Sequence, residues 1–292
     1  MEQAMISWQV GDVKITRVVE LEATGGSRFI LPDATPDACR TMAWMQPHFC
    51  TPEGKLRMSV HALVIDTGRR RIVVDTCIGN DKPRTMANWS HLQTNFLADL
   101  ASAGYARESI DTVLCTHLHV DHVGWNTMLV EGEWQPTFPN ARYLVHQAEW
   151  AYWKDEQSGE SPQIMSDSVL PVLAAGLLDM VAADHHVCEE VCLESTPGHT
   201  PGHVSIRIRS GGQQALITGD ALHHPCQMER LEWCSPADFD SRAAQDTRTA
   251  MLSQAADDGV LVIGTHFAAP TAGHVRRNAQ GSFWLDVGTA TA

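Results

Sequence analysis

The chain of 292 residues contains no long apolar run and no recognisable export signal. No hydrophobic stretch approaches the roughly 18 residues that a membrane-spanning helix needs. The first ten residues, MEQAMISWQV, lack a basic segment followed by an apolar one, so we expect no signal peptide. The sequence therefore predicts a cytoplasmic protein with no membrane partner.

Basic charge and paired cysteines are also scarce. The sequence has 21 Lys+Arg against 35 Asp+Glu, a formal net charge of −14. An acidic surface repels phosphate backbones, which argues against a nucleic-acid partner. None of the eight cysteines forms a C-x-x-C pair or has the spacing of a zinc finger. In a cytoplasm we expect these thiols to stay reduced.

The composition is that of a globular chain, with 43% apolar residues. No linker-like stretch divides the chain, so residues 1–292 are expected to form a single domain. Strand and helix patterns alternate along the whole chain, with hairpins near both ends. This order predicts an α/β fold of the α+β type: an αββα sandwich with two mixed β-sheets face to face and helices on the outer faces. Residues 23–58 form an irregular N-terminal segment that would cap the site or contribute to a dimer interface.

Hydrophobic periodicity gives the approximate place of each element. Hairpins are expected over 8–20 and 59–77, and again around 278–281. Further strands are expected at 110–117, 141–146, 191–196, 204–210, 214–221 and 260–266. Helices are expected at 91–103, after residue 146, at 168–181 and at 241–257.

The 15 histidines include a dense cluster, T-H-L-H-V-D-H-V-G at 116–124. Four residues of ligand type, His117, His119, Asp121 and His122, fall within six positions. Because the chain is extended after a buried strand, residues two apart point the same way. His117 and His119 can then share one cation, while Asp121 and His122 turn toward a second.

Three more strand ends carry a residue of ligand type. The segment S-T-P-G-H-T-P-G-H (195–203) presents His199, L-I-T-G-D-A-L (216–222) contains Asp220, and V-I-G-T-H-F (262–267) contains His266. Strand ends that meet at one edge of a sandwich would bring these side chains together. Imidazole and carboxylate donors suit Zn²⁺, and also Mn, Fe or Co.

The pattern H-x-H-x-D-H, then G-H-T-P-G-H, then G-D and a final His resembles the metallo-β-lactamase superfamily over about residues 60–270. The resemblance implies a first metal site of His117, His119 and His199. It implies a second site of Asp121, His122 and His266, with Asp220 as the carboxylate that bridges both ions. His203 would be structural, and Asp75 would support the site from behind.

The resemblance implies two divalent metal ions, with zinc as the first expectation. Such a pair lowers the pKa of a bridging water from 15.7 toward roughly 7, and the resulting hydroxide would cleave a lactone, carboxylic ester or phosphotriester. Asp121 and Asp220 would take part as ligands. His223 would hydrogen-bond the developing oxyanion, protonate the leaving oxygen, or only pack beside the metals. Acyl-homoserine lactonases have a Tyr at that place, so the chain is more similar to the methyl-parathion-hydrolase-like group of the lactonase branch.

Several aromatic residues are candidates for an apolar substrate pocket for a small-molecule ester or lactone. Trp125 and Phe267 adjoin ligand segments, and the others are Trp44, Phe49 and Trp89; plain core or a dimer contact is the alternative for each. A homodimer is a family-level expectation. The alternative functions are a mononuclear iron enzyme like a persulfide dioxygenase, a thioesterase, and a metal protein without catalysis.

Overall fold

The computed structural model describes residues 6–288, and the chain divides into two compact units. The first is formed by residues up to 20 and by 60–185, and the second by residues 21–59 and by those from 186 onward. That residues 1–292 form one domain stays a prediction. Within residues 6–288, no helix combines the length and the apolar character needed to cross a bilayer.

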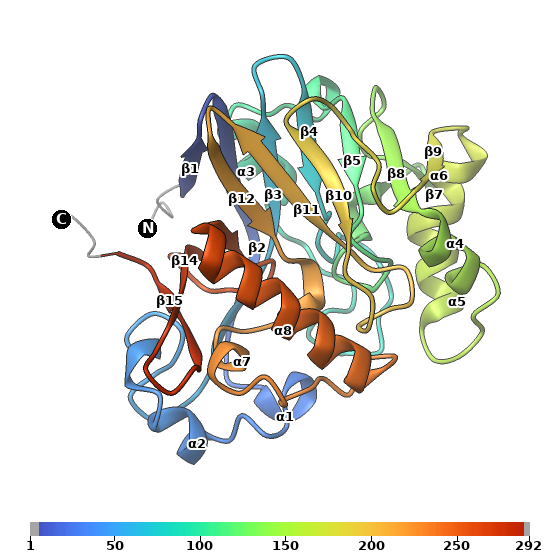
Figure 1. Ribbon diagram of the computed structural model, residues 1–292. Helices are drawn as coiled ribbons and strands as arrows, with labels where there is room; N and C mark the ends of the chain where they lie inside the picture. Colours follow the sequence, from blue (N-terminus) through green and yellow to red (C-terminus); the bar gives the residue numbers. More distant parts are fainter. Residues whose placement is uncertain (1–5, 289–292) are drawn as a thin grey trace. The chain divides into compact units, whose positions relative to one another are not determined.

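A mixed seven-stranded sheet runs mainly through the first unit (Figure 1). Its order is β1 (Ser7–Val10), β2 (Val13–Thr24), β3 (Arg57–Asp66), β4 (Arg71–Val74), β5 (Thr112–Leu114), β8 (Arg142–His146) and β9 (Leu178–Val181). The pairs β1–β2 and β3–β4 are antiparallel hairpins. Strands β4, β5, β8 and β9 are parallel, so their carboxyl ends lie at one edge of the sheet.

Short helices and one small hairpin complete the first unit. They are α3 (Phe96–Ser102), the 3₁₀ turns η2 (Arg107–Ser109) and η3 (Gly124–Asn126), the hairpin β6 (Thr127–Val130) with β7 (Glu133–Pro136), α4 (Gln147–Trp153), α5 (Ser161–Ile164), the π-helix η4 (Met165–Val169) and α6 (Leu170–Ala174). Helix α4 follows β8 directly and packs against β8 and β9.

The second unit holds a mixed six-stranded sheet. Its order is β10 (Val191–Ser195), β11 (Val204–Ser210), β12 (Gln213–Ile217), β13 (Leu261–Ile263), β14 (Ala272–Arg277) and β15 (Phe283–Asp286). All neighbours are antiparallel except β12 and β13. The helical elements are α1 (Ser27–Ile30), α2 (Pro36–Arg40), η1 (Ala43–Met45), η5 (Gly219–Ala221), α7 (Cys226–Glu229) and α8 (Ser241–Asp258).

The long helix α8 has clear sequence signals at both ends. The Asp240 side chain accepts hydrogen bonds from the backbone of Arg242 and Ala243, and Gly259 ends the helix with a φ of 64°. The helix packs against β14 of the same unit. It begins where the sequence predicts and ends one residue later.

The irregular segment expected at 23–58 contributes to the hydrophobic core of the second unit. Met45 and Phe49 are buried there together with Leu252 and Phe267. The segment contains only the short helices α1, α2 and η1 between β2 and β3. Burial of its apolar side chains accounts for an ordered chain with little regular structure. Its expected role in capping the site or a dimer interface stays a prediction.

Two mixed sheets with helices confirm the predicted fold class and are consistent with an α/β sandwich. The helix predicted at 168–181 is wrong in its second half. Gly176, with a φ of 70°, follows the last helical turn, and residues 178–181 form β9, which pairs with β8. An apolar run fits a helix or a buried strand. Pairing with β8 makes residues 178–181 a strand. The helix expected from residue 91 begins only at Phe96, because Asn80 holds Thr94 in a loop through its side chain.

Candidate metal centre

In the first unit, parallel strands β4 and β5 bring two loop segments to one edge. Val74 pairs with Leu114, so Asp75, one residue after β4, and Thr116, two residues after β5, lie at the same edge. Asp75 has a φ of 55°, a left-handed conformation that turns the chain sharply at this point. Its carboxylate accepts hydrogen bonds from the backbone N–H and the hydroxyl of Thr116, both at 2.8 Å. The predicted supporting residue therefore lies directly behind the histidine motif.

The hydrogen bonds of Asp75 and Thr116 define the tautomers of two imidazoles. Nδ1 of His122 donates to Oδ2 of Asp75 at 2.8 Å. The hydroxyl hydrogen of Thr116 goes to Asp75, so its oxygen accepts from Nδ1 of His117 at 3.0 Å. In both rings the lone pair is then on Nε2, the arrangement that prepares a histidine to bind a metal ion.

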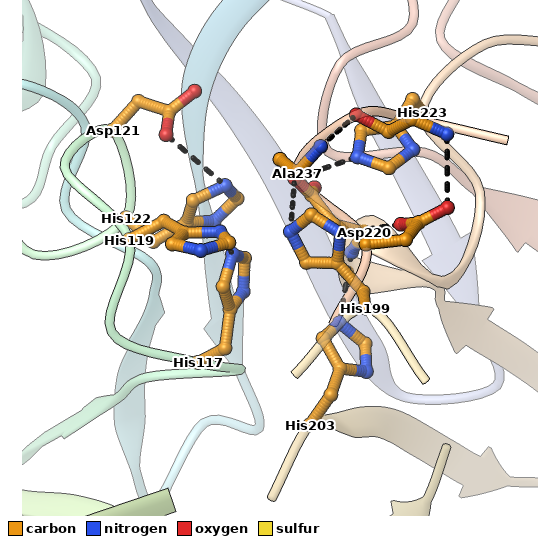
Figure 2. Close-up of polar contacts among 12 residues, drawn as sticks. His117, His119, Asp121, His122, His199, His203, Asp220, His223 and Ala237 are labelled. Atoms are coloured by element: carbon orange, nitrogen blue, oxygen red, sulfur yellow. Dashed lines mark hydrogen bonds and ion pairs between the residues drawn. The ribbon is translucent and has the colours of Figure 1, made fainter. Parts of the chain in front are cut away.

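The four motif side chains come from one loop (Figure 2). Nε2 of His117 lies 3.0 Å from Nδ1 of His119, and the rings of His117 and His122 are 4.0 Å apart. Two nitrogens that bind one tetrahedral zinc ion at 2.0–2.1 Å are about 3.3 Å apart. Oδ1 of Asp121 lies 3.7 Å from Nε2 of His122. The first unit thus gathers the three imidazoles and the carboxylate that the sequence predicts.

The motif loop has a further anchor in helix α4. The backbone N–H of Leu118 and the indole N–H of Trp153 both donate to Oε1 of the buried Glu149, at 3.0 and 2.7 Å. The same Trp153 ring lies edge-on to His119, with centroids 5.3 Å apart. Glu149 therefore fixes the backbone between His117 and His119 and the ring that packs beside them.

In the second unit, strand register likewise places the candidate ligands. Parallel pairing of Ile217 with Ile263 puts Asp220 and His266, each three residues further on, at the same edge. The loop that contains His199 joins β10 to β11, and the pairing of β11 with β12 brings it to that edge as well.

The tautomers of His199 and His266 follow the same pattern as in the first unit. Nδ1 of His199 donates to Oδ1 of Asp238 at 2.8 Å, and Nδ1 of His266 donates to the carbonyl of Ser59 at 3.1 Å. In both rings the lone pair is again on Nε2. Burial raises the pKa of Asp238, but the hydrogen bond from His199 and the neighbouring imidazoles outweigh it and leave this pKa lowered.

The Asp220 carboxylate separates these two imidazoles. Its Oδ2 lies 3.5 Å from Nε2 of His199, and its Oδ1 lies 3.1 Å from Nε2 of His266. Thr265 donates to the same Oδ1 at 3.2 Å. Each carboxylate oxygen therefore faces a different imidazole, which is the arrangement that a carboxylate shared by two ions requires.

Two more histidines lie beside Asp220 (Figure 2). His203 accepts a hydrogen bond on Nε2 from the backbone of Asp220 at 2.9 Å and is bonded through Nδ1 to Thr196, as a structural residue would be. Nε2 of His223 lies 3.4 Å from Oδ2 of Asp220, and neither ring nitrogen has a hydrogen-bond partner among residues 6–288. Burial lowers the pKa of His223 to about 3.

The predicted pocket residues have different environments in their own units. Phe49 and Phe267 are fully buried and pack edge-to-face in the core of the second unit. Trp125 is buried in the first unit and stacks on Phe96. Trp44, half-buried, donates its indole N–H to Glu229 at 2.8 Å, and Trp89 is half-buried. The pocket role of these five residues stays a prediction.

Sequence reasoning identified Asp75 but missed two other carboxylates that orient the site, Asp238 and Glu149. Asp238 lies in the loop segment S-P-A-D-F-D, where no strand end or motif spacing marks it. Glu149 did carry a signal, since it is an acidic residue in the first turn of a helix that follows a buried strand. Within the second unit, the donor atoms of His199, His223 and Asp238 all lie within 4.8 Å of one another.

The sequence model of the Metallo-beta-lactamase superfamily matches residues 57–266. The chain therefore belongs to this superfamily, which confirms the resemblance carried by the motifs. The matched range includes all seven predicted ligands and begins at the first residue of β3.

Two of the similar relatives are named as lactonases. An N-acyl homoserine lactonase of a Bacillus species is 33% identical over 149 residues, which are 50% of this chain and 51% of that protein. The chain thus spans about half the length of this relative. An N-acyl homoserine lactonase of Bacillus cereus is 27% identical over 208 residues, which are 66% of this chain and 75% of that protein.

Two solved structures share the fold over nearly the whole chain. The hydrolase AbOPH of the beta lactamase superfamily gives a TM-score of 0.81 at 24% identity, with 99% of both chains covered. AidC, a dizinc quorum-quenching lactonase, gives 0.77 at 20% identity, with 96% of both chains covered. At these identities the likeness establishes the fold.

Proposed function

We propose that this protein is a metal-dependent hydrolase with a dinuclear site. The proposed ligands are His117, His119, Asp121 and His122 of the first unit with His199, Asp220 and His266 of the second. Membership of the superfamily and the spacing of the motifs support one shared site. Relatives that are hydrolases support its being an enzyme.

The observation that carries the proposal is the set of partners at Nδ1 of four imidazoles, from which their tautomers follow. Four imidazoles, those of His117, His122, His199 and His266, have Nδ1 committed to an acceptor of the chain and the lone pair on Nε2. The Nε2 atoms of these four rings face other candidate ligands, whereas Nε2 of His203 accepts a hydrogen bond from the backbone N–H of Asp220. Imidazole and carboxylate donors without a thiolate fit zinc, and they also accept Mn, Fe or Co.

The chain's own residues would then perform three tasks. His117, His119 and His199 would hold one ion, while Asp121, His122 and His266 would hold the other. Asp220 would bridge them, since its two oxygens already face different imidazoles. When bound, the ions would polarise the scissile carbonyl or phosphoryl group and lower the pKa of a coordinated water. His223, buried beside Asp220, would donate a hydrogen bond to the substrate oxygen that gains charge.

The proposed substrate is a small lactone, carboxylic ester or phosphotriester. The relatives named N-acyl homoserine lactonases favour a lactone among these. His223 three residues after Asp220 widens the expectation to other esters, because an imidazole donor does not depend on one acyl group. Trp44, Trp89, Trp125, Phe49 and Phe267 remain the proposed walls for the apolar part of the substrate.

The test combines metal analysis with turnover. The purified zinc-loaded protein should hold about two equivalents of metal. It should hydrolyse at least one of a panel of acyl-homoserine lactones, γ- and δ-lactones, p-nitrophenyl esters and methyl parathion. His117→Ala should lose this turnover and one equivalent of metal while keeping the fold. His186→Ala, at an exposed histidine outside the motifs, is the matched control and should change neither.

Three results would reject the proposal. They are retention of turnover by His117→Ala, less than about one ion in the zinc-saturated protein, and oxygen uptake with glutathione persulfide in place of hydrolysis. The last would establish a mononuclear iron dioxygenase instead. Rapid hydrolysis of a glutathione thioester alone would make the protein a thioesterase with the same ligands.

A further inference from the structure

The carboxylate of Glu20, near the middle of β2, accepts hydrogen bonds from several segments of the chain. The residue is buried, and its two oxygens accept four hydrogen bonds. Ile78 donates its backbone N–H at 2.7 Å and Gly79 at 3.2 Å. The indole N–H of Trp125 donates at 2.6 Å, and the hydroxyl of Thr94 at 3.3 Å. Hydrogen bonds to an ionised carboxylate are stronger than neutral ones, so four of them hold the Glu20 side chain in one position.

Three of the four donors belong to two segments at the candidate site, the one that lies behind the ligands and the one that carries them. Ile78 and Gly79 follow Asp75, whose carboxylate fixes His122. Trp125 follows His122 by three residues. The single side chain of Glu20 therefore connects residues 78–79, behind the site, to Trp125 in the segment that carries the ligands.

The two segments are also in direct backbone contact. Thr76 N donates to the carbonyl of His122, Trp125 N donates to the carbonyl of Thr76, and Gly124 N donates to the carbonyl of Cys77, each at 2.7 Å. A Cβ at Gly124 would lie 1.8 Å from the carbonyl oxygen of Ile78. With no space between the segments, a movement of 76–79 must displace 122–125 as well.

We propose that Glu20 is a positioning residue for the metal ligands of the first unit. It acts through the turn at 78–79 and through Trp125, and it sets the placement of Asp75, His122 and Asp121. This inference rests on the proposed metal site. The ion held by Asp121 and His122 should therefore depend on Glu20 more than the ion held by His117 and His119.

The decisive variant is Glu20→Gln, which keeps the size of the side chain. One of the two acceptor oxygens becomes an NH₂ group, so at least one backbone or indole N–H faces a donor instead of an acceptor. Changes in the groups that orient metal ligands typically weaken metal binding 10–100-fold, and we expect about tenfold for the ion held by Asp121 and His122. Glu22→Gln, two residues along the same strand and exposed, is the matched control and should leave both affinities unchanged.

Affinity is measured by chelator competition with zinc, and site geometry by the visible spectrum of the cobalt-loaded protein. Both are recorded at a temperature where the metal-free variant is folded. A purely structural role for Glu20 would lower the unfolding midpoint of the metal-free protein. It would alter neither the zinc affinity of the site held by Asp121 and His122 nor the cobalt spectrum.

A second variant tests the route from Glu20 to the ligands. Trp125→Phe removes the indole N–H yet keeps an aromatic ring to stack on Phe96. It should lower the affinity for the same ion severalfold. In the double variant with Glu20→Gln, the fold-loss of affinity should be less than the product of the two single fold-losses.

The inference is overturned if both single variants bind two zinc ions with wild-type affinity, or if their losses simply multiply. Should Glu20→Gln not fold, wild-type affinity in Trp125→Phe alone overturns it. Failure of the proposed function is a different result, since it would be seen without any change at Glu20, as less than about one ion in the zinc-saturated wild-type protein or as turnover retained by His117→Ala.

Discussion

A buried ion-pair network in the first unit gives a sharp test of the packing. Arg84 donates two hydrogen bonds to Asp167 of the π-helix η4, at 2.7 and 3.0 Å. Nζ of Lys82 lies 3.7 Å from the same carboxylate, bonds to its backbone carbonyl at 3.0 Å, and sits over the ring of Trp134. The side chains of Lys82, Arg84 and Asp167 are at most 1% exposed. Asp167→Asn therefore leaves two buried cations without their counter-charge.

The expected loss follows from that burial. Removing one partner of a buried ion pair lowers the free energy of unfolding by about 3–5 kcal/mol. Burial lowers the pKa of Lys82 to about 7, so Lys82 can release its proton in the variant whereas Arg84 cannot. We therefore expect Asp167→Asn to lower the free energy of unfolding by about 3 kcal/mol at pH 7. The loss should be smaller at pH 9, where Lys82 is neutral in both folded proteins, than at pH 6.

The matched control is Asp179→Asn in the same unit. Asp179 is also held by two hydrogen bonds from one arginine, Arg142, but these side chains are 42% and 47% exposed. Exposed pairs of this kind contribute under about 1 kcal/mol. Urea unfolding of the metal-free proteins, followed by tryptophan fluorescence, measures both losses. Equal losses for the two variants, or a loss for Asp167→Asn below about 1 kcal/mol, would refute the reasoning from burial.

Three further predictions concern the candidate site and its surroundings. Gly124→Ala places a methyl group 1.8 Å from the carbonyl oxygen of Ile78 and should lower the free energy of unfolding by about 3 kcal/mol; an unchanged urea midpoint would contradict this close approach. Asp238→Asn removes the charge behind His199 and should weaken zinc binding 10–100-fold in chelator competition, with the fold retained by circular dichroism. Burial lowers the pKa of His224 to about 4, so the unfolded chain takes up this proton first as the pH falls from 6.5. His224 alone should therefore lower wild-type stability by about 3 kcal/mol between pH 6.5 and 4, and His224→Gln should remove that part of the slope in urea unfolding at several pH values.

The sequence was sufficient to predict most elements because their patterns are local. The hairpin turn at Gly11 and the Asp240 cap with Gly259 define β1–β2 and α8 from neighbouring residues alone. Residues 168–181 show the limit of that approach, because an apolar run fits a helix and a buried strand equally well. Its second half became β9 through pairing with β8, more than thirty residues earlier in the chain. Most of the motif residues were recognisable, since they follow strands of the parallel pairs β4–β5 and β12–β13.

The orientation of those ligands is encoded elsewhere in the chain. His122 is oriented by Asp75, 47 residues earlier, and His199 by Asp238, 39 residues later. His266 donates to the carbonyl of Ser59, 207 residues away, where any residue type would supply the acceptor. A motif can therefore reveal the imidazoles but not which nitrogen of each carries the lone pair. That choice depends on contacts created by the fold, and a chain with the same motif but without these acceptors would hold its histidines in mixed tautomers and bind metal less tightly. Metal affinity in this protein should consequently respond to substitutions at Asp75 and Asp238 even though neither carboxylate belongs to the proposed ligand set.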